Sequence, residues 1–427
     1  MDFLIGGVSA VHDALLAAAF RQRGVSCTPV PPPTRADLAV GRALLPRGHP
    51  NTVYSLSGAV VRAIQARQAE FATVVPSAEQ AACAYVLPEC EYWNVGADVQ
   101  RAFGVAGIVD ASVVTLPVFE HGCELRARAA GVAWDEALEQ ALTESAAAGD
   151  ILVRLRGEAR ITRADRSGAD AIVDACVASA VRATERGRLL TPTLEACASR
   201  IDRLAKRPVS GARVRVRITG DFVASLSDGD PGADIVSRLE RLGADVECAT
   251  YSEWVLFRAW EARNLASTSP DGPGAAMNAL RARHIESAVR RTFESLASAA
   301  RLTNRSLPDM DEVASIAAPY YRPELRGGTS HLEVGIFLRT ARAHSADLVI
   351  SVKPFASIPS SAVSDSVLYA IAQQTRGVSF LSLETTGDAD AQIASRLELA
   401  VDAARANVAS HQAPWSDDSA ADSRRRT

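Results

Sequence analysis

The stretch "ARVRVRITGDFVASLSDGDPGADIVSRLERLGADVECATYSEWVLF", Ala212 to Phe257, decides the fold class. Its alternating apolar run predicts a strand that ends near Gly220, followed by a loop rich in glycine and aspartate. A helix that ends at Gly243, a second short strand and a second helix complete the pattern. Strands that alternate with helices at this spacing favour a parallel sheet with helices on both faces.

The same alternation occurs in residues 1–125, where the predicted strands are 2–7, 25–30, 71–76 and 110–118. Residues 126–207 have helical periodicity and contain no clear strand. A second α/β unit follows at 208–412, with a helical insertion at about 265–325, and the polar tail 413–427 is predicted to be disordered. We therefore predict an α/β protein with two doubly wound, flavodoxin- or Rossmann-like parallel-sheet domains and a helical linker.

Composition argues for an ordinary globular protein of 427 residues, with 48% hydrophobic residues, 22% charged residues and a net charge of −4. This charge does not favour a nucleic-acid or membrane-surface partner. The N-terminus has no basic segment typical of a signal peptide, and no apolar run is long enough to span a membrane, so we expect a cytoplasmic protein. The seven cysteines form no CxxC pair, which argues against a self-contained zinc site or a disulfide framework.

One loop stands out, in "VISVKPFASIPSSAV", Val349 to Val363. It offers Lys353 and Ser357 at the carboxyl end of a predicted strand, where α/β proteins keep their chemistry. A serine–lysine nucleophile pair is one interpretation. Nothing in the spacing favours that pair, and serines that cap the next helix explain the composition better.

Other loops carry residue types suited to chemistry. Gly220 and Asp221 begin a loop that lacks the known phosphate-binding and calcium-loop spacings, which favours a turn with a helix cap. His331 and Glu333 lie at a helix start in "RGGTSHLEVG" and are candidates for acid–base catalysis, although a plain helix-terminal histidine is the stronger interpretation. Cys90, in "VLPECEYWNVG", precedes a helix, where a thiol can act as a ligand or remain a buried bystander.

Taken together, these segments resemble the 2-hydroxyacyl-CoA dehydratase superfamily, and in particular the dehydratase-like domain of large acyl-CoA dehydratase activase proteins. The family has a strand, Gly-Glu, a helix and then "SEW"; here Gly220 and Asp221 take the Gly-Glu place, and Ser252, Glu253 and Trp254 match the "SEW". The segment "ADLVISVKPFASIPSSAV" is similar to the family's "GADGIVNVMPFxCMPG", and "LSLETTGDADAQIASRLELAV" is similar to its "DG" and "TRLEAF" segment. The N-terminal half resembles the "CxP" and "GPCRFGQY" segments more loosely.

The resemblance implies a site between two α/β domains. In this family, cysteines from such loops hold an iron–sulfur cluster that passes one electron to a CoA thioester after ATP-driven delivery by an activase. The matching positions here are Cys90, Ser357 and Gly48, and only Cys90 is a thiol. Because one thiolate cannot hold a [4Fe–4S] cluster in the family manner, the resemblance implies a divergent member without the cluster.

Two functions therefore stay open. The first is a non-catalytic subunit or scaffold without a cofactor, which pairs with a homologous subunit or an ATP-dependent activase as a homo- or heterodimer. The alternative is an iron–sulfur component of an acyl-CoA dehydratase or reductase system, in which Cys90 and ligands from a partner hold a [4Fe–4S] cluster. Such a component would act as part of a lyase or reductase on CoA thioesters.

Overall fold

The computed structural model describes residues 2–74, 83–88, 95–116, 134–207, 213–228, 234–268, 275–302, 306–325, 328–355, 365–375, 377–387 and 390–412. The first sheet is parallel, and its four described strands have the order β2-β1-β3-β4. These strands are β1 (Asp2–Ile5), β2 (Cys27–Pro29), β3 (Cys83–Pro88) and β4 (Ala111–Leu116). Its helices are α1 (Ala10–Gln22), α2 (Arg35–Leu44), α3 (Asn51–Val74) and α4 (Val95–Val105).

Both faces of this sheet are buried. Leu4 packs into a cluster with residues of α2, α3 and α4, whereas its neighbours Phe3 and Ile5 pack with Leu16 and Phe20 of α1 on the other face. Successive side chains of a strand point to opposite faces, so a strand covered on both faces must be apolar throughout. This requirement explains the uninterrupted apolar sequence of β1.

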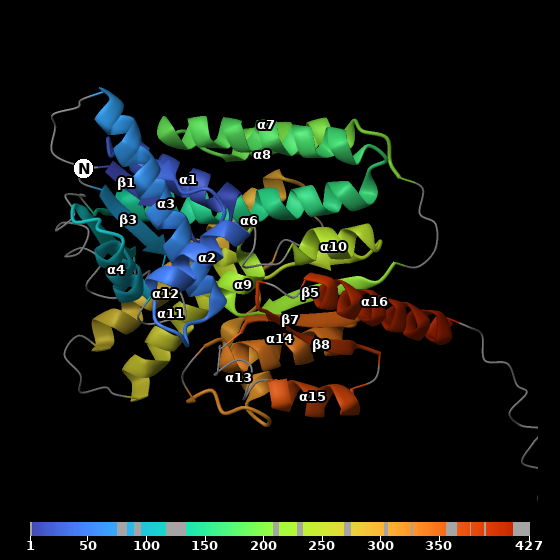
Figure 1. The fold of residues 1–427 in the computed structure, drawn as a ribbon. Helices are drawn as coiled ribbons and strands as arrows, with labels where there is room; N and C mark the ends of the chain where they lie inside the picture. The colour runs from blue at the N-terminus through green and yellow to red at the C-terminus, as the bar shows by residue number, and fades with distance from the viewer. Residues whose placement is uncertain are drawn as a thin grey trace, which may run out of the picture.

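A layer of long helices follows the first sheet. It consists of α6 (Glu136–Thr162), α7 (Arg166–Glu185) and α8 (Thr191–Asp202), and α12 (Ala275–Ala299) packs against α6 and α8 from the later part of the chain. Figure 1 shows α7 and α8 on the outside of this layer, with α6 beneath them. Small residues of α6, including Ala146, Ala147 and Ala148, are buried in the largest hydrophobic cluster and let the neighbouring helices approach closely.

The second sheet repeats the strand order of the first. Its four described strands, β5 (Arg215–Gly220), β6 (Asp245–Glu247), β7 (Leu348–Pro354) and β8 (Ser379–Thr385), are parallel in the order β6-β5-β7-β8. The helices of this half are α9 (Phe222–Leu226), α10 (Ile235–Arg241), α11 (Tyr251–Thr268), α13 (Met310–Ala317), α14 (Ser330–Ala343), α15 (Asp365–Gln374) and α16 (Asp390–Gln412). Ile350 packs towards α10 and α16, and Val349 packs towards α14 and α15, so this sheet is also covered on both faces.

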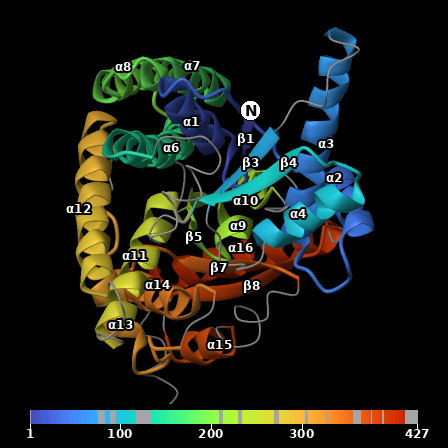
Figure 2. The ribbon, with the colours of Figure 1, turned by 90° about the vertical axis from the view of Figure 1, so that its left-hand side faces the viewer.

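The carboxyl ends of the two sheets lie close to each other (Figure 2). The Ala10 N–H, which follows β1, donates to Asp228 Oδ2 at 2.8 Å, and Asp228 follows β5 and α9. Asn51 Nδ2 donates to Thr385 Oγ1 at 3.4 Å, at the end of β8. The order in which strands are added switches to the opposite side of the sheet between β1 and β3, and between β5 and β7. Open α/β sheets form their binding crevices at such a switch point.

The predicted α/β class with parallel sheets is confirmed. The predicted strand at 71–76 is wrong over its first four residues, because Phe71 to Val74 continue helix α3. Extending a helix adds one hydrogen bond per residue without a new nucleation cost, so the β-branched tail stays helical. The third strand of the sheet is Cys83–Pro88, which pairs with both β1 and β4.

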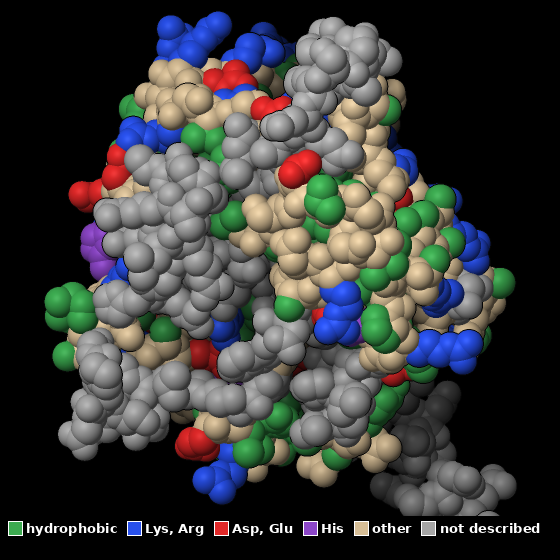
Figure 3. All heavy atoms as spheres, turned by 60° about the vertical axis from the view of Figure 1, so that its left-hand side comes forward, with side chains coloured by type: hydrophobic (Ala, Val, Ile, Leu, Met, Phe, Trp, Pro, Cys, Tyr) green, Lys and Arg blue, Asp and Glu red, His purple; other side chains and the backbone are tan. Residues whose placement is uncertain are grey.

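Basic and acidic side chains are interspersed among the described residues on the face drawn in Figure 3. Within the described parts of the chain, no helix is long and apolar enough to cross a membrane.

Gly220 provides a test of the close contact between β5 and β7. Its φ is +122°, and a Cβ there would lie 2.2 Å from the carbonyl oxygen of Val352. We expect Gly220→Ala to lower the free energy of unfolding by about 3 kcal/mol or more, because it adds a backbone clash to the strain of a positive φ. Chemical denaturation measures this loss.

The control is Gly243→Ala, at φ +82° with no atom within 4 Å of the added Cβ. This variant carries the conformational cost alone and should lose only about 1 kcal/mol. Equal losses in the two variants would show that the β5–β7 approach is not the constraint.

Candidate functional site

A buried polar network joins the two halves of the molecule at the start of α1. Ser9 follows the glycine turn after β1 and is the N-cap of α1, where its Oγ accepts the His12 N–H. The same Oγ lies 2.7 Å from His12 Nδ1, and His12 Nε2 lies 3.1 Å from Asp150 Oδ1. Ser9, His12 and Asp150 are 5%, 1% and 2% exposed. We call these three residues the junction network.

Asp150 connects α6 to two further elements. Besides His12, its carboxylate accepts the backbone N–H groups of Tyr251 at 2.8 Å and Ser252 at 2.9 Å. These are among the first N–H groups of α11, which have no partner inside that helix, and a negative charge at this end is favourable. Because a carboxylate only accepts, a neutral His12 carries its proton on Nε2, and its Nδ1 then accepts the Ser9 hydroxyl proton.

The junction network has the connectivity of a Ser–His–Asp triad, but its surroundings suit a structural role. Asp228 already accepts the N–H of Ala10, and the buried Asp13 carboxyl accepts the Val8 N–H at 3.4 Å. Acyl transfer at a serine needs free donors for a developing oxyanion. Here Asp13 and Asp228 already accept the nearby backbone N–H groups, and a carboxylate there would repel the negative charge of an oxyanion. The network is therefore suited to hold α1, α6 and α11 together.

Asp13 makes this region sensitive to pH. Burial raises the pKa of Asp13 to about 7, with a smaller increase from Asp228, while His12 and the Val8 N–H lower it. Between about pH 4 and pH 7 the folded chain therefore binds more protons at Asp13 than the unfolded chain does, so this residue's contribution to stability falls as the pH rises. Because the pKa of Asp13 is about 7 in the folded chain and about 4 in the unfolded chain, the free energy of unfolding falls by roughly 4 kcal/mol over this pH range.

We expect Asp13→Asn to remove this loss, because asparagine resembles the protonated acid. Denaturation at several pH values should show that the variant is more stable than the native chain at pH 8 and gains less on acidification. Asp110→Asn changes an exposed carboxylate and serves as the control. An unchanged pH profile in Asp13→Asn would contradict the burial-driven shift.

The residues of the "ITGDF" and "SEW" segments serve as structural contacts. Asp221 is the N-cap of α9 and accepts the Ala224 N–H at 3.0 Å. Both carboxylate oxygens of Glu253 accept from the single nitrogen Arg217 Nη2, at 2.7 and 2.8 Å, and Glu253 forms a reciprocal cap with Thr250. Ser252 contributes its backbone N–H to Asp150. These contacts fix the start of α11 against β5.

Lys353, at the end of β7, lies in a second buried network. Its side chain is 0% exposed; its Nζ lies 3.4 Å from Glu333 Oε2 and also donates to Asp365 Oδ1. Glu333 accepts from Ser351 Oγ and Thr329 Oγ1, each at 2.6 Å. Burial raises the pKa of Asp365, whereas the charge of Lys353 lowers it. The network ties β7 to α14 and α15.

Removal of the ammonium group tests this network. We expect Lys353→Met to lower the free energy of unfolding by about 3 to 5 kcal/mol at pH 7, because two buried carboxylates lose their counter-charge. The deficit should shrink as the pH falls, since protonation of Asp365 removes one of those charges. Urea denaturation at pH 5 and pH 8 measures both effects.

The only other lysine supplies the control, since Lys206 is exposed and Lys206→Met should change stability by less than about 0.5 kcal/mol. The double variant Lys353→Met/Asp365→Asn should recover part of the loss. A double variant that is less stable than Lys353→Met would contradict the account.

The other predicted site residues do not converge. His331 is buried in an aromatic group, with its ring centroid 5.3 Å from that of Phe257 and 4.7 Å from that of Trp260, while Glu333 faces β7. Gly48 lies in the turn between α2 and α3 with φ +103°. Cys90 and Ser357 lie outside the described residues.

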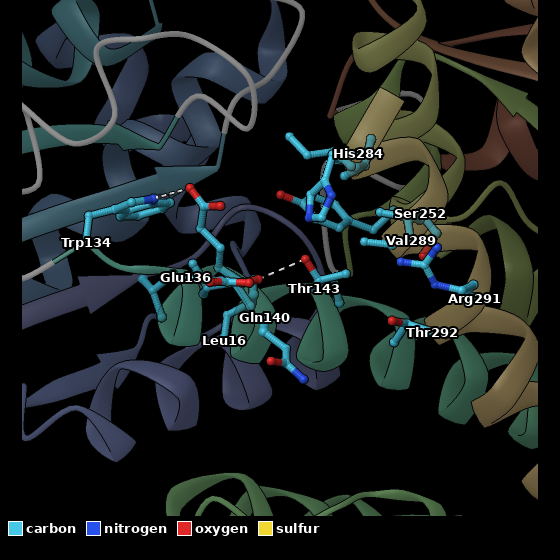
Figure 4. A pocket seen from close by; sticks show the side chains of 18 residues that line it. Leu16, Trp134, Glu136, Gln140, Thr143, Ser252, His284, Val289, Arg291 and Thr292 are labelled. Atoms are coloured by element: carbon cyan, nitrogen blue, oxygen red, sulfur yellow. Dashed lines mark hydrogen bonds between the residues drawn. The ribbon is translucent and has the colours of Figure 1, made fainter. Parts of the chain in front are cut away.

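A cavity of about 400 Å³ lies between α6 and α12 and extends to the start of α11. We call it the α6–α12 cavity. Figure 4 shows Trp134 at one end and His284 and Arg291 on the opposite side. Its apolar lining comes from Ile5, Leu16, Leu142, Val255, Ile285 and Val289. Tyr251 and Ser252, the partners of Asp150, also line it.

Among the described residues, no three histidine, cysteine or acidic side chains are grouped so as to hold a metal ion. The three positions that match the cluster ligands of the resembled family do not fit a [4Fe–4S] cluster. They are a thiol at Cys90, a hydroxyl at Ser357 and no side chain at Gly48, whose φ is positive. No model of a protein family and no curated protein matches this chain.

Sequence reasoning missed the junction network and the cavity. The segment "GGVSAVHD" carries a weak signal, because Ser9 and His12 have the spacing of an N-cap residue and its third helical position. Asp150 lies 138 residues after His12, and no local pattern connects them.

Proposed function

We propose that this chain is a divergent relative of the 2-hydroxyacyl-CoA dehydratases with two doubly wound domains, and that it acts as a non-catalytic subunit or scaffold. Its partner in this role is a homologous subunit or an ATP-dependent activase. The alternative is a cluster-bearing component that uses Cys90 together with ligands from the partner.

One observation carries the proposal: the described residues of the family-like segments are used to hold the fold together. Gly220 lets β5 approach β7, and Glu253 pairs with Arg217. Lys353, which stands where the family has methionine, lies between Glu333 and Asp365. Each is buried and makes contacts between separate elements. These contacts support a role as a scaffold. Breaking a buried ion pair to let one of its members react with a substrate would cost much of the stability that the pair provides.

The arrangement of the two sheets also supports the proposal. Both have the same strand order, and their carboxyl ends lie together, as a site between two α/β domains requires. Cys90 follows the end of β3 by two residues, and Ser357 follows the end of β7 by three. These two strands hold equivalent places in the two sheets.

Iron analysis of protein purified without oxygen tests the proposal. We expect only trace iron and no iron–sulfur absorption, before and after reconstitution with iron and sulfide, because a single matched thiol is present. About four iron atoms per chain would instead indicate one [4Fe–4S] cluster and would favour the alternative.

Cys90→Ser is the matched control for that alternative. If the native chain binds iron and Cys90→Ser does not, Cys90 is a ligand; if both bind iron, the cluster lies elsewhere and the family alignment is wrong. Copurification of the tagged chain with a coexpressed homologous subunit or activase tests the partner. No complex with either would contradict the subunit role.

A further inference from the structure

We propose that the α6–α12 cavity binds a long, unbranched carboxylate of the class of medium-chain fatty acids. Its single charged head lies at Arg291, and its apolar chain extends towards Trp134. This site is separate from the loops matched to the dehydratase family, and the inference does not rest on the proposed function.

The cavity is elongated. Trp134 Nε1 donates to Glu139 Oε1 at 2.7 Å, and Arg281 of α12 pairs with the same oxygen, so Trp134 lies at the level of Arg281. Arg291 follows Arg281 on α12 by ten residues, which is about 15 Å along a helix axis. Figure 4 accordingly shows Trp134 and Arg291 on opposite sides of the cavity. An extended chain can run between these two ends, whereas a compact ligand can reach only one of them.

The cation at one end is available to a ligand. Arg291 lines the cavity, and its Nη1 donates to Ser287 on the preceding turn of α12. In the part of the chain that the structure describes, no carboxylate pairs with Arg291. A guanidinium has five N–H donors in a planar fork, so donors remain for a bidentate contact with a ligand carboxylate. Thr292 and Ser252 add polar groups on the same side of Figure 4.

The polar groups of the α6 wall need no second charge on the ligand. The Glu139 carboxylate is already held by Trp134 and Arg281, and Thr143 Oγ1 donates to the Glu139 carbonyl oxygen at 2.9 Å. Glu136 is exposed at the wall beside Trp134, where water can solvate its carboxylate. This end therefore favours the uncharged end of a chain that packs against the indole ring.

The surface between the two ends is apolar. Its side chains are those of Leu16, Leu142, Val255, Ile285 and Val289. The volume of about 400 Å³ is within the range of small-molecule sites. An extended alkyl chain advances about 1.2 Å per bond, as an extended backbone does, so about twelve bonds cover the distance of about 15 Å. The cavity is therefore suited to a saturated acid of about 10 to 12 carbons.

Titration calorimetry of the full chain with octanoate, decanoate, dodecanoate and tetradecanoate tests the length, with each probe kept below its micelle concentration. Each buried CH₂ group should strengthen binding about fourfold, so we expect at least about a tenfold gain for each two carbons up to dodecanoate. Tetradecanoate should bind no more tightly than dodecanoate, because its chain is longer than the cavity.

The head group is tested with 1-decanol, which has no charge, and with decylamine, which has the opposite charge. We expect decanoate to bind at least about tenfold more tightly than either. Arg291→Gln should weaken decanoate about tenfold and leave 1-decanol unchanged, because only the carboxylate uses the guanidinium. Arg283→Gln is the matched control, since Arg283 is exposed on the same helix and lies outside the described lining of the cavity.

Two substitutions on opposite walls should block the chain. Ala288→Trp on α12 and Thr143→Phe on α6 each place a bulky ring in the cavity and should abolish decanoate binding. Circular dichroism shows which of the variants keeps the native fold, and the second variant replaces the first if that one does not fold.

Four results would overturn the inference. They are affinity that keeps rising from dodecanoate to tetradecanoate, decylamine binding as tightly as decanoate, unchanged decanoate binding in Arg291→Gln or in a folded blocking variant, and no binding of dodecanoate up to about 1 mM. The first would indicate partition onto apolar surface, and the second would place the charged head at Glu136 instead of Arg291.

Discussion

The buried carboxylate of Asp150 is the contact on which the arrangement of the two sheets depends. A buried charge is costly unless donors surround it, and Asp150 receives donors from His12 on α1 and from two amides at the start of α11. Because α1 belongs to the first sheet and α11 to the second, a single group on α6 fixes both halves to the helical layer. Moving either sheet away would remove part of the set of donors around this buried charge.

The repeated strand order brings the carboxyl ends of the two sheets together, and two buried polar networks lie there among the described residues. In the first, Ser9 and His12 satisfy each other and Asp150. In the second, Lys353 is held between Glu333 and Asp365. Closed networks stabilise a particular arrangement, and they withdraw their members from contact with a substrate. Among the described residues, both networks hold separate elements together at the carboxyl ends of the strands.

The sequence was sufficient for the α/β class, since this depends on periodicity within a few turns of chain. It failed at residues 71–74, where a β-branched sequence continues a helix. It also grouped His331 with Glu333, although residues two apart on a helix point about 200° apart, and the structure places them in separate clusters. The junction network was out of reach because its members are brought together only by the packing of α1, α6 and α11.

The α6–α12 cavity differs from the closed networks because its walls carry charges at an opening. The cavity is connected to the junction network through α11. Tyr251 and Ser252 line the cavity, and their backbone N–H groups donate to Asp150. The first turn of α11 therefore has two roles in this packing, because it completes the cavity wall and supplies two of the donors to Asp150.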